Sequence, residues 1–474
     1  MRYYLGVDAG TTEIKSVLFD EKGRVVCSSR KRVRKIYPKP QWVEKDPIEA
    51  LNALILSVRE TLEKARVKKV EAMGLANEGE SVVIWDAQSG KPIYNAITWE
   101  DRRTAKLCKQ LKHLEKEIKN KTGLKLESYF SATKARWIVE NAKRSTKLMF
   151  GTMDSWFLWN LTGFHVTDVS TASRTMLFDI NSLKWDEELI SLFGLQQLEF
   201  PEVKQNSEFV AHTKSEIFGF PIAISALCVD QQASLYGHGC TKQGELKITY
   251  GTGAFALANI GDAPKYSQSL LTTVAWKIDG KTSYAFDGGV YSAGSAINWL
   301  IELGVAKSEK EVEELSRSVH SSEALFVIPA FSGLACPYWI DDLKASIHGI
   351  TLSHTRAHFA RATLESIAYL VSEIVEAMQK ELGSIAKIRV DGGMSKNRFL
   401  VQLQSDVLQK ELYVCTFKDV TAFGVASLAK RAIEGNGFSQ KKYVKYSPGS
   451  NYERQKTDWK EVLTRTLYSG GISL

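Results

Sequence analysis

Residues 3–19, YYLGVDAGTTEIKSVLF, hold two apolar runs on either side of a Gly-Thr-Thr turn. Runs of this length, joined by a short turn that contains glycine, predict a β-hairpin. A second stretch with the same plan, ELKITYGTGAFALANI, lies at residues 245–260, about half the chain further on. Because the same strand, Gly-Thr turn and strand recur at this spacing, we expect two lobes of related architecture.

Helices and short strands alternate around both hairpins. Residues 70–76 and 388–390 are short apolar runs typical of buried strands. Apolar residues recur at helical spacing in longer segments, which predict helices over 46–67, 132–141, 292–303, 355–382, 397–408 and 422–433. The alternation indicates an α/β fold, with a first lobe over residues 1–235 and a second over 236–474.

The composition limits the kind of protein and its surroundings. A chain of 474 residues is too long for one hydrophobic core, and its 44% apolar and 24% charged residues are ordinary for a globular protein. It has no apolar run of about 18 residues and no signal-peptide pattern, so we expect no membrane partner and a cytoplasmic location. The six cysteines form no C-x-x-C pair, which indicates free thiols in a reducing compartment.

The net charge of +8 is partly local, because residues 30–35 read RKRVRK. A basic cluster can bind nucleic acid, but charged residues also protect the exposed edge of a sheet. The second interpretation is favoured, so no nucleic-acid partner is expected.

The two Gly-Thr turns favour a phosphate clamp. The chain contains neither G-x-x-x-x-G-K-[ST] nor the third glycine of a dinucleotide loop. Instead, residues 8–12 read DAGTT and residues 250–253 read YGTG, and Asp391-Gly392-Gly393 opens a later helix. Glycine lets backbone N–H groups approach an anion and threonine adds hydroxyl donors, so the turns together predict a site for a phosphate-bearing ligand.

The order of several separated motifs resembles the FGGY family of carbohydrate kinases, most of all its members that act on glycerol. The resemblance runs from Asp8 to about residue 430. It rests on an ordered set of segments that includes DAGTT, QWVEKDPIEA, YNAITWEDRRT, TDVSTASRTMLFDI, VDQQASLYG, TYGTGAFALANIG and VDGGMSKNRFLVQLQSD. It implies two actin-like (ribonuclease-H-like) ATPase lobes around a central cleft in which ATP and a small polyol or sugar meet.

The resemblance also implies roles for individual residues. Asp230 would be the catalytic base, which suits phosphoryl transfer because a carboxylate must accept the hydroxyl proton. Asp8 would hold Mg²⁺ through water. The acceptor-binding residues would be Glu80, Trp99, Tyr129, Asp230, Gln231 and Phe255. The ATP-binding residues would be Thr11, Thr12, Lys15, Thr252, Gly294, Asn298, Gly393 and Asn397. A homodimer or homotetramer is common in the family.

Several residues depart from the pattern of the members that act on glycerol, among them Glu100, which stands where glutamine is common. Lys15 stands where they have arginine, and Glu13 stands where they have a small residue, so Glu13 must point away from phosphate or pair with Lys15. Gly79 replaces the arginine that would bind two glycerol hydroxyls. Either the freed space admits a larger polyol or ketose, or another cation such as Arg102 or Arg103 compensates and glycerol remains the acceptor.

A further alternative is a regulatory protein that has the actin-like fold and binds ATP but phosphorylates no small molecule. The acids, the hairpins and the aromatic residues of the expected pocket are all present, which favours an enzyme.

Overall fold

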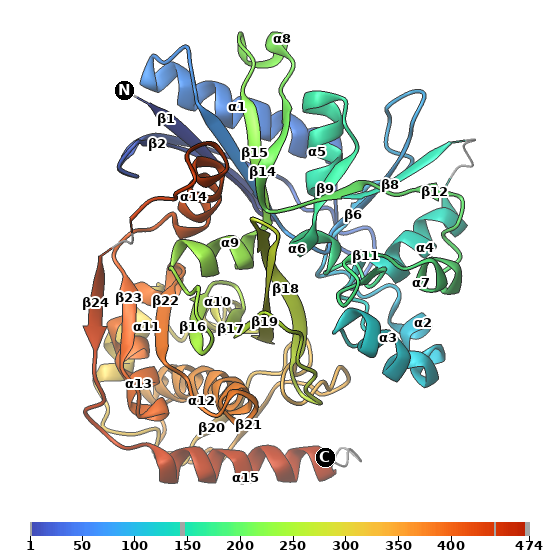
Figure 1. Cartoon of the computed structure of the whole chain (residues 1–474). Helices are drawn as coiled ribbons and strands as arrows, with labels where there is room; N and C mark the ends of the chain where they lie inside the picture. Colours follow the sequence, from blue (N-terminus) through green and yellow to red (C-terminus); the bar gives the residue numbers. More distant parts are fainter. Residues whose placement is uncertain (1, 143–146, 440–441, 470–474) are drawn as a thin grey trace.

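The computed structural model describes residues 2–142, 147–439 and 442–469, so the outer ends of the expected lobes, residues 1 and 474, lie outside the described residues. The first lobe is built on a six-stranded mixed sheet with the order β14-β15-β5-β1-β2-β3 (Figure 1). Its strands are β1 (Tyr3–Ala9), β2 (Glu13–Asp20), β3 (Val25–Arg32), β5 (Ala72–Asn77), β14 (Ser207–His212) and β15 (Ala223–Val229).

A second, five-stranded sheet in this lobe has the order β12-β8-β6-β7-β4. Its strands are β4 (Glu44–Lys45), β6 (Val82–Asp86), β7 (Ala96–Ile97), β8 (Leu148–Thr152) and β12 (Leu198–Glu199). The helices of the lobe are α1 (Pro47–Ala65), α2 (Ala105–Gln110), α3 (Glu115–Thr122), α4 (Ser131–Asn141), α5 (Met153–Thr162), α6 (Val169–Ala172), α7 (Glu187–Leu192) and α8 (Ser215–Phe218).

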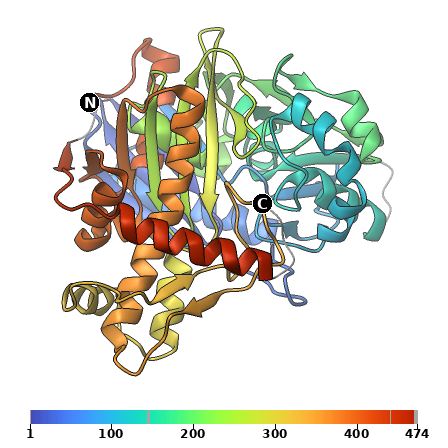
Figure 2. The same ribbon diagram turned by 90° about the horizontal axis from the view of Figure 1, so that it is seen from below.

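The other lobe contains a seven-stranded sheet with the order β18-β19-β17-β16-β22-β23-β24. Its strands are β16 (Glu245–Tyr250), β17 (Ala254–Gly261), β18 (Leu271–Ile278), β19 (Lys281–Val290), β22 (Lys387–Asp391), β23 (Leu412–Cys415) and β24 (Tyr443–Tyr446). Its helices are α10 (Gly294–Glu302), α11 (Glu309–Arg317), α12 (Arg356–Leu382), α13 (Arg398–Leu408) and α15 (Glu453–Ser469). The long helix α12 packs on this sheet, and α15, near the C-terminus, crosses over α12 (Figure 2).

Both predicted hairpins form. β1 pairs with β2, and β16 pairs with β17, in antiparallel register across their Gly-Thr turns. The basic residues 30–35 begin on β3, which is an edge strand of its sheet, as the charge pattern indicated. Within the described residues, no helix is long and apolar enough to cross a membrane.

Two helices join the lobes. Helix α9 (Asp230–Gly237) follows β15 and packs against strands of both large sheets, while α14 (Val420–Glu434), late in the chain, packs on β1, β5 and β15 of the first lobe (Figure 1). The helices approach backbone to backbone, because a Cβ atom at Gly424 would lie 1.9 Å from the carbonyl oxygen of Ala233. The boundary expected near residue 235 stays a prediction, and the packing crosses it, since α14 from the C-terminal half packs on the first sheet.

Candidate active site

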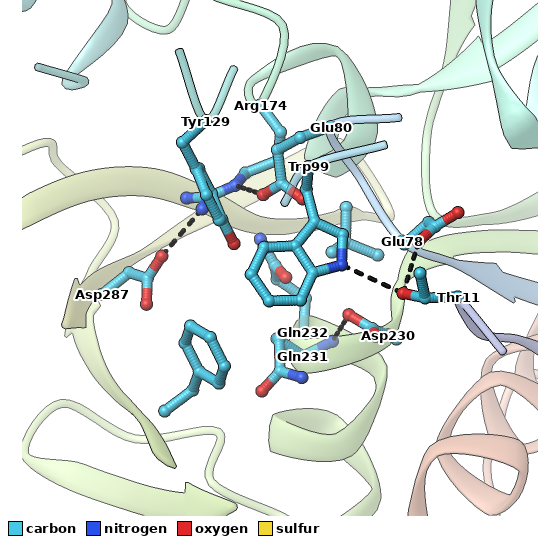
Figure 3. A pocket seen from close by; sticks show the side chains of 12 residues that line it. Thr11, Glu78, Glu80, Trp99, Tyr129, Arg174, Asp230, Gln231, Gln232 and Asp287 are labelled. Atoms are coloured by element: carbon cyan, nitrogen blue, oxygen red, sulfur yellow. Dashed lines mark hydrogen bonds and ion pairs between the residues drawn. The ribbon is translucent and has the colours of Figure 1, made fainter. Parts of the chain in front are cut away.

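A small cavity of about 100 Å³ lies where the two lobes meet, at the start of α9 (Figure 3). All six residues expected to bind the acceptor line it: Glu80, Trp99, Tyr129, Asp230, Gln231 and Phe255. The remaining lining residues are Thr11, Glu78, Arg174, Val229, Gln232 and Asp287. Pockets for drug-sized ligands measure about 300–1,000 Å³, so this cavity suits a much smaller molecule.

Aromatic rings form the apolar walls of the cavity. Trp99 lies edge to face with Tyr129 and with Phe255, at ring-centroid distances of 5.5 and 6.2 Å. The indole Nε1 of Trp99 donates a hydrogen bond of 3.0 Å to Thr11 Oγ1 in the first hairpin. The aromatic wall expected to cover the carbon atoms of an acceptor is thereby connected to the turn expected to hold phosphate.

Asp230 occupies the first turn of α9, directly after the buried strand β15. Its Oδ1 accepts a hydrogen bond of 2.6 Å from the backbone N–H of Gln231. Burial, followed by the nearby charge of Glu80, raises the pKa of Asp230 to about 6, while Lys247 opposes the shift. A carboxylate with this pKa is largely ionised at neutral pH and can accept a proton.

Glu78 connects three segments of the first lobe. Its Oε1 accepts a hydrogen bond from Lys45 Nζ on β4, and its Oε2 accepts one of 2.5 Å from Thr11 Oγ1. The side chains of Lys45 and Glu78 are 2% and 3% exposed, so the ion pair is shielded from water. Because Thr11 in turn accepts from Trp99, this pair fixes both the first hairpin and the aromatic wall.

The space left by Gly79 is occupied. A Cβ atom at residue 79 would lie 2.8 Å from Cγ of Arg174 and 2.9 Å from Cγ2 of Val229. Arg174 Nε donates a hydrogen bond of 2.6 Å to Glu80 Oε1, and its Nη2 lies 2.9 Å from Asp287 Oδ2 (Figure 3). The absence of a side chain at residue 79 therefore makes room for an arginine that reaches the cavity from the turn after α6.

Neither arginine considered as a substitute lines this cavity. The guanidinium of Arg103 is buried, donates to Asp101 and Glu44, and stacks 3.9 Å from the ring centroid of Trp42. Arg102 lies over the ring of Tyr291 and lines a neighbouring cavity of about 470 Å³. The expectation that one of them compensates for Gly79 finds no support in their positions.

The first hairpin also contributes to a larger cavity of about 850 Å³. Lys15 lines this cavity and forms an ion pair with Asp419, directly before α14. Glu13 faces Arg30 across the β2–β3 pair, with 3.8 Å between Oε1 and Nη1. Glu13 thus pairs with the edge strand and not with Lys15, while Thr12 is exposed in the turn.

The second hairpin packs against the start of α10. The backbone N–H of Gly294 donates a hydrogen bond of 3.0 Å to the carbonyl of Gly251, and a Cβ atom at Gly294 would lie 3.4 Å from Sδ of Met394. The exposed Thr252, Gly294 and the turn after Asp391 therefore lie close together. Gly393 lines the 850 Å³ cavity together with Lys15.

Of the two asparagines expected to contact ATP, Asn397 directly precedes α13 and Asn298 lies on α10. Asn397 caps α13, because its Oδ1 accepts a hydrogen bond of 2.9 Å from the backbone N–H of Leu400. Asn298 is exposed on α10 and lines none of the cavities described above.

The carboxyl group of Asp8 suits a cation. Burial, followed by the charge of Asp230, raises the pKa of Asp8 to about 7, although Lys15 lowers it. A divalent cation would relieve this repulsion. Among the described residues, no group of three or more His, Cys, Asp or Glu side chains converges on one point, so an ion there would keep water or phosphate oxygens as most of its ligands, as Mg²⁺ does.

Five lining residues had no predicted role: Glu78, Arg174, Val229, Gln232 and Asp287. Gln232 directly follows Gln231, and Glu78 lies two residues before Glu80, so their neighbours in sequence could have indicated them. Arg174 lies inside TDVSTASRTMLFDI, one of the segments that carry the family resemblance, so that segment could have indicated it, whereas none of the quoted segments contains Asp287.

Two actin-like lobes around a cleft with convergent carboxylates define an ATP-dependent phosphotransferase of the sugar-kinase class. The chain matches the N-terminal domain of the FGGY family of carbohydrate kinases over residues 3–237 and the C-terminal domain of that family over residues 246–433. It belongs to this family.

Relatives with known names are similar over nearly the whole chain. A glycerol kinase of Thermococcus onnurineus is 43% identical over 91% of this chain and 90% of its own, and glycerol kinase 2 of Thermotoga maritima is 40% identical over 98% and 99%. The crystal structure of Plasmodium falciparum glycerol kinase with ADP superposes with a TM-score of 0.91 at 32% identity, over 100% of this chain and 99% of the other. A xylulose kinase of Lactobacillus acidophilus, at 21% identity and a TM-score of 0.88 over 99% of both chains, shows that the fold is shared.

Proposed function

We propose that this protein transfers the γ-phosphoryl group of ATP to a terminal hydroxyl of glycerol, giving glycerol 3-phosphate. The observation that carries the proposal is the cavity of about 100 Å³, which combines aromatic walls with Asp230 and fits a three-carbon polyol better than a sugar. The names of the relatives with about 40% identity support the same acceptor.

The acceptor is held by two kinds of contact. Trp99 and Phe255 cover the carbon atoms, while Glu80, Tyr129 and Gln231 hydrogen-bond the hydroxyl groups. Asp230 takes the proton from the terminal hydroxyl as the oxygen attacks phosphorus in line with the departing ADP oxygen. Its pKa of about 6 leaves it ready for this role at neutral pH.

ATP occupies the cleft on the other side of the reacting hydroxyl. The backbone N–H groups and hydroxyls of the turns at Thr11, Thr12 and Thr252 hold the phosphates, together with Lys15. The adenosine end rests beside Gly294, Asn298, Gly393 and Asn397. Closure of the lobes about α9 and α14 excludes water and limits hydrolysis of ATP.

Asp8 would hold Mg²⁺ through water, and the ion would neutralise charge on the phosphate oxygens. The fit rests on the surroundings of Asp8, where burial and the charge of Asp230 raise its pKa to about 7 and Lys15 offsets them only in part. We further propose that the enzyme acts in the cytoplasm, as a homodimer or homotetramer.

The test measures ADP release with ATP and Mg²⁺ for glycerol and for a panel of four- to six-carbon polyols and ketoses, with the phosphorylated product identified by mass. Turnover of glycerol above the panel is expected. Turnover of a larger acceptor instead would show that the loss of the arginine at residue 79 changes the specificity. ATP binding without any phosphorylated product would indicate a regulator.

A further inference from the structure

Lys247 is a buried lysine beside the acceptor cavity that the proposed mechanism does not use. It lies on β16 and is 0% exposed. Its Nζ donates one hydrogen bond to Oε1 of Gln231 and a second, of 2.8 Å, to Oγ1 of Thr249. Lysine is almost never fully buried unless it is paired, so the contacts of this side chain indicate its task.

The surroundings of Lys247 fix its ammonium group in place. Burial lowers the pKa of Lys247, whereas the charges of three carboxylates act in the opposite direction: Asp391, Asp230 and Asp287. Thr249 Oγ1, which accepts from Nζ, donates in turn to Oδ1 of Asp391. Oδ2 of Asp391 accepts a hydrogen bond of 2.8 Å from Ser234 Oγ on α9. The ammonium is therefore held between α9, β16 and the end of β22.

The contact with Lys247 decides which end of the Gln231 amide faces the acceptor. A lysine ammonium has hydrogen-bond donors only, so it must face the amide oxygen and not the amide nitrogen. Gln231 lines the cavity next to Asp230 (Figure 3). With Oε1 held by Lys247, Nε2 is the end of the amide that is left to donate into the cavity.

A hydrogen-bond donor at this point is useful because the cavity is rich in acceptors. Four carboxylates line it: Glu78, Glu80, Asp230 and Asp287. Two N–H groups of other lining residues already have partners, since Trp99 Nε1 donates to Thr11. The second is Nε2 of Gln232, which donates a hydrogen bond of 3.3 Å to Thr273 Oγ1. A polyol hydroxyl that donates its proton to a carboxylate still needs a donor for its oxygen.

We propose that Lys247 is a positioning residue of the acceptor site, which holds Oε1 of Gln231 so that Nε2 donates to a hydroxyl oxygen of the acceptor. This role rests on the proposed function, because it concerns the binding of the same polyol. Lys247 is not among the described residues that line the cavity, so it acts through Gln231. Its second bond, through Thr249 to Asp391, anchors that orientation to the strand that leads into the turn at Gly393.

The first experiment replaces Gln231 by glutamate, which has the same shape and keeps an oxygen for Lys247 but loses the donor. A polar group left without its partner in a buried site corresponds to about a 5- to 150-fold loss of affinity. We expect Gln231→Glu to raise the KM for glycerol about fivefold or more and to change the KM for ATP less than about threefold. An unchanged KM for glycerol would overturn the proposal.

The second experiment is a double-variant cycle of Lys247→Met and Gln231→Ala. Lys247→Met should raise the KM for glycerol about fivefold or more in the wild type but less than about twofold in the Gln231→Ala background, because Lys247 acts through Gln231. An equal factor in both backgrounds would mean that Lys247 has only a structural role, and would overturn the proposal.

Lys430→Met is the matched control for the loss of a buried lysine. Lys430 is 6% exposed and pairs with Glu434 on α14, and neither residue lines the cavity. Its loss should lower the Tm but leave the KM for glycerol within about twofold of the wild-type value.

The outcomes separate the role of Lys247 from the function on which it rests. No phosphorylation of glycerol by the wild type would refute the proposed function itself. Normal wild-type turnover, with an unchanged KM for glycerol in Gln231→Glu or with equal factors in the cycle, would refute the role of Lys247 alone. The Tm and the binding of a fluorescent ATP analogue report whether each variant is folded. If Lys247→Met does not fold, the result for Gln231→Glu decides.

Discussion

Replacement of Lys45 by methionine is expected to destabilise the first lobe strongly. Lys45 and Glu78 form a buried pair, so the substitution leaves a carboxylate without its counter-ion and shielded from water. Breaking a buried pair by removing one partner costs about 3–5 kcal/mol. For a domain of about 200 residues each kcal/mol lowers the Tm by about 2–4 °C, which gives an expected decrease of about 6–20 °C.

The partner substitutions make this prediction specific to the pair. Glu78→Gln leaves the ammonium of Lys45 buried and should also lower the Tm, whereas the double variant removes both charges and should recover most of the loss. The four proteins are compared by circular dichroism at one scan rate and concentration. Lys109→Met is the control, because its ion pair with Asp342 is 65% and 80% exposed and is worth less than about 1 kcal/mol.

Two results would refute the reasoning. Lys45→Met could melt within the range of the Lys109 control, in which case the pair adds no net stability. The decreases of the two single variants could also simply add in the double variant, in which case the two charges do not interact.

Three further predictions concern catalysis and the contact between the lobes. Asp230→Asn should lower kcat about 10²- to 10⁴-fold with little change in the KM for ATP, as measured by coupled ADP release. A near-normal kcat would exclude Asp230 as the base. Protonated Asp230 cannot accept a proton, so kcat/KM of the wild type should fall about tenfold per pH unit below about pH 6. The residual activity of Asp230→Asn should lack this decline. Gly424→Ala should destabilise the protein by about 1–3 kcal/mol, because the new methyl group meets the carbonyl oxygen of Ala233; an unchanged Tm would show that α9 and α14 separate without cost.

Much of the fold could be predicted because its signals are local. The hairpins follow from short apolar runs around Gly-Thr turns, and the long helices follow from apolar spacing, as at 355–382, where the structure has Arg356–Leu382. The six acceptor residues were implied by the family resemblance of the segments that contain them, and all of them line one cavity. Their chemical roles stay predictions until the kinetics are measured.

What the sequence did not indicate depends on contacts between distant segments. Arg174 reaches Gly79 only because the turn after α6 folds over the end of β5, and Asp287 comes from a strand of the other lobe. The pairing of Glu13 with Arg30 likewise depends on the register between β2 and β3, which apolar periodicity alone does not determine. The packing of α14 on the first sheet joins residues separated by most of the chain.

That packing has a consequence for synthesis on the ribosome. Strands β1, β2 and β5 are made early, but the helix that covers one face of them, α14, spans residues 420–434. Until that helix emerges, an apolar face of the first sheet stays exposed, and contacts of such high sequence separation form slowly. The nascent N-terminal half is therefore the stage at which this chain is most exposed to aggregation, and a release of the chain before residue 434 would leave neither lobe complete.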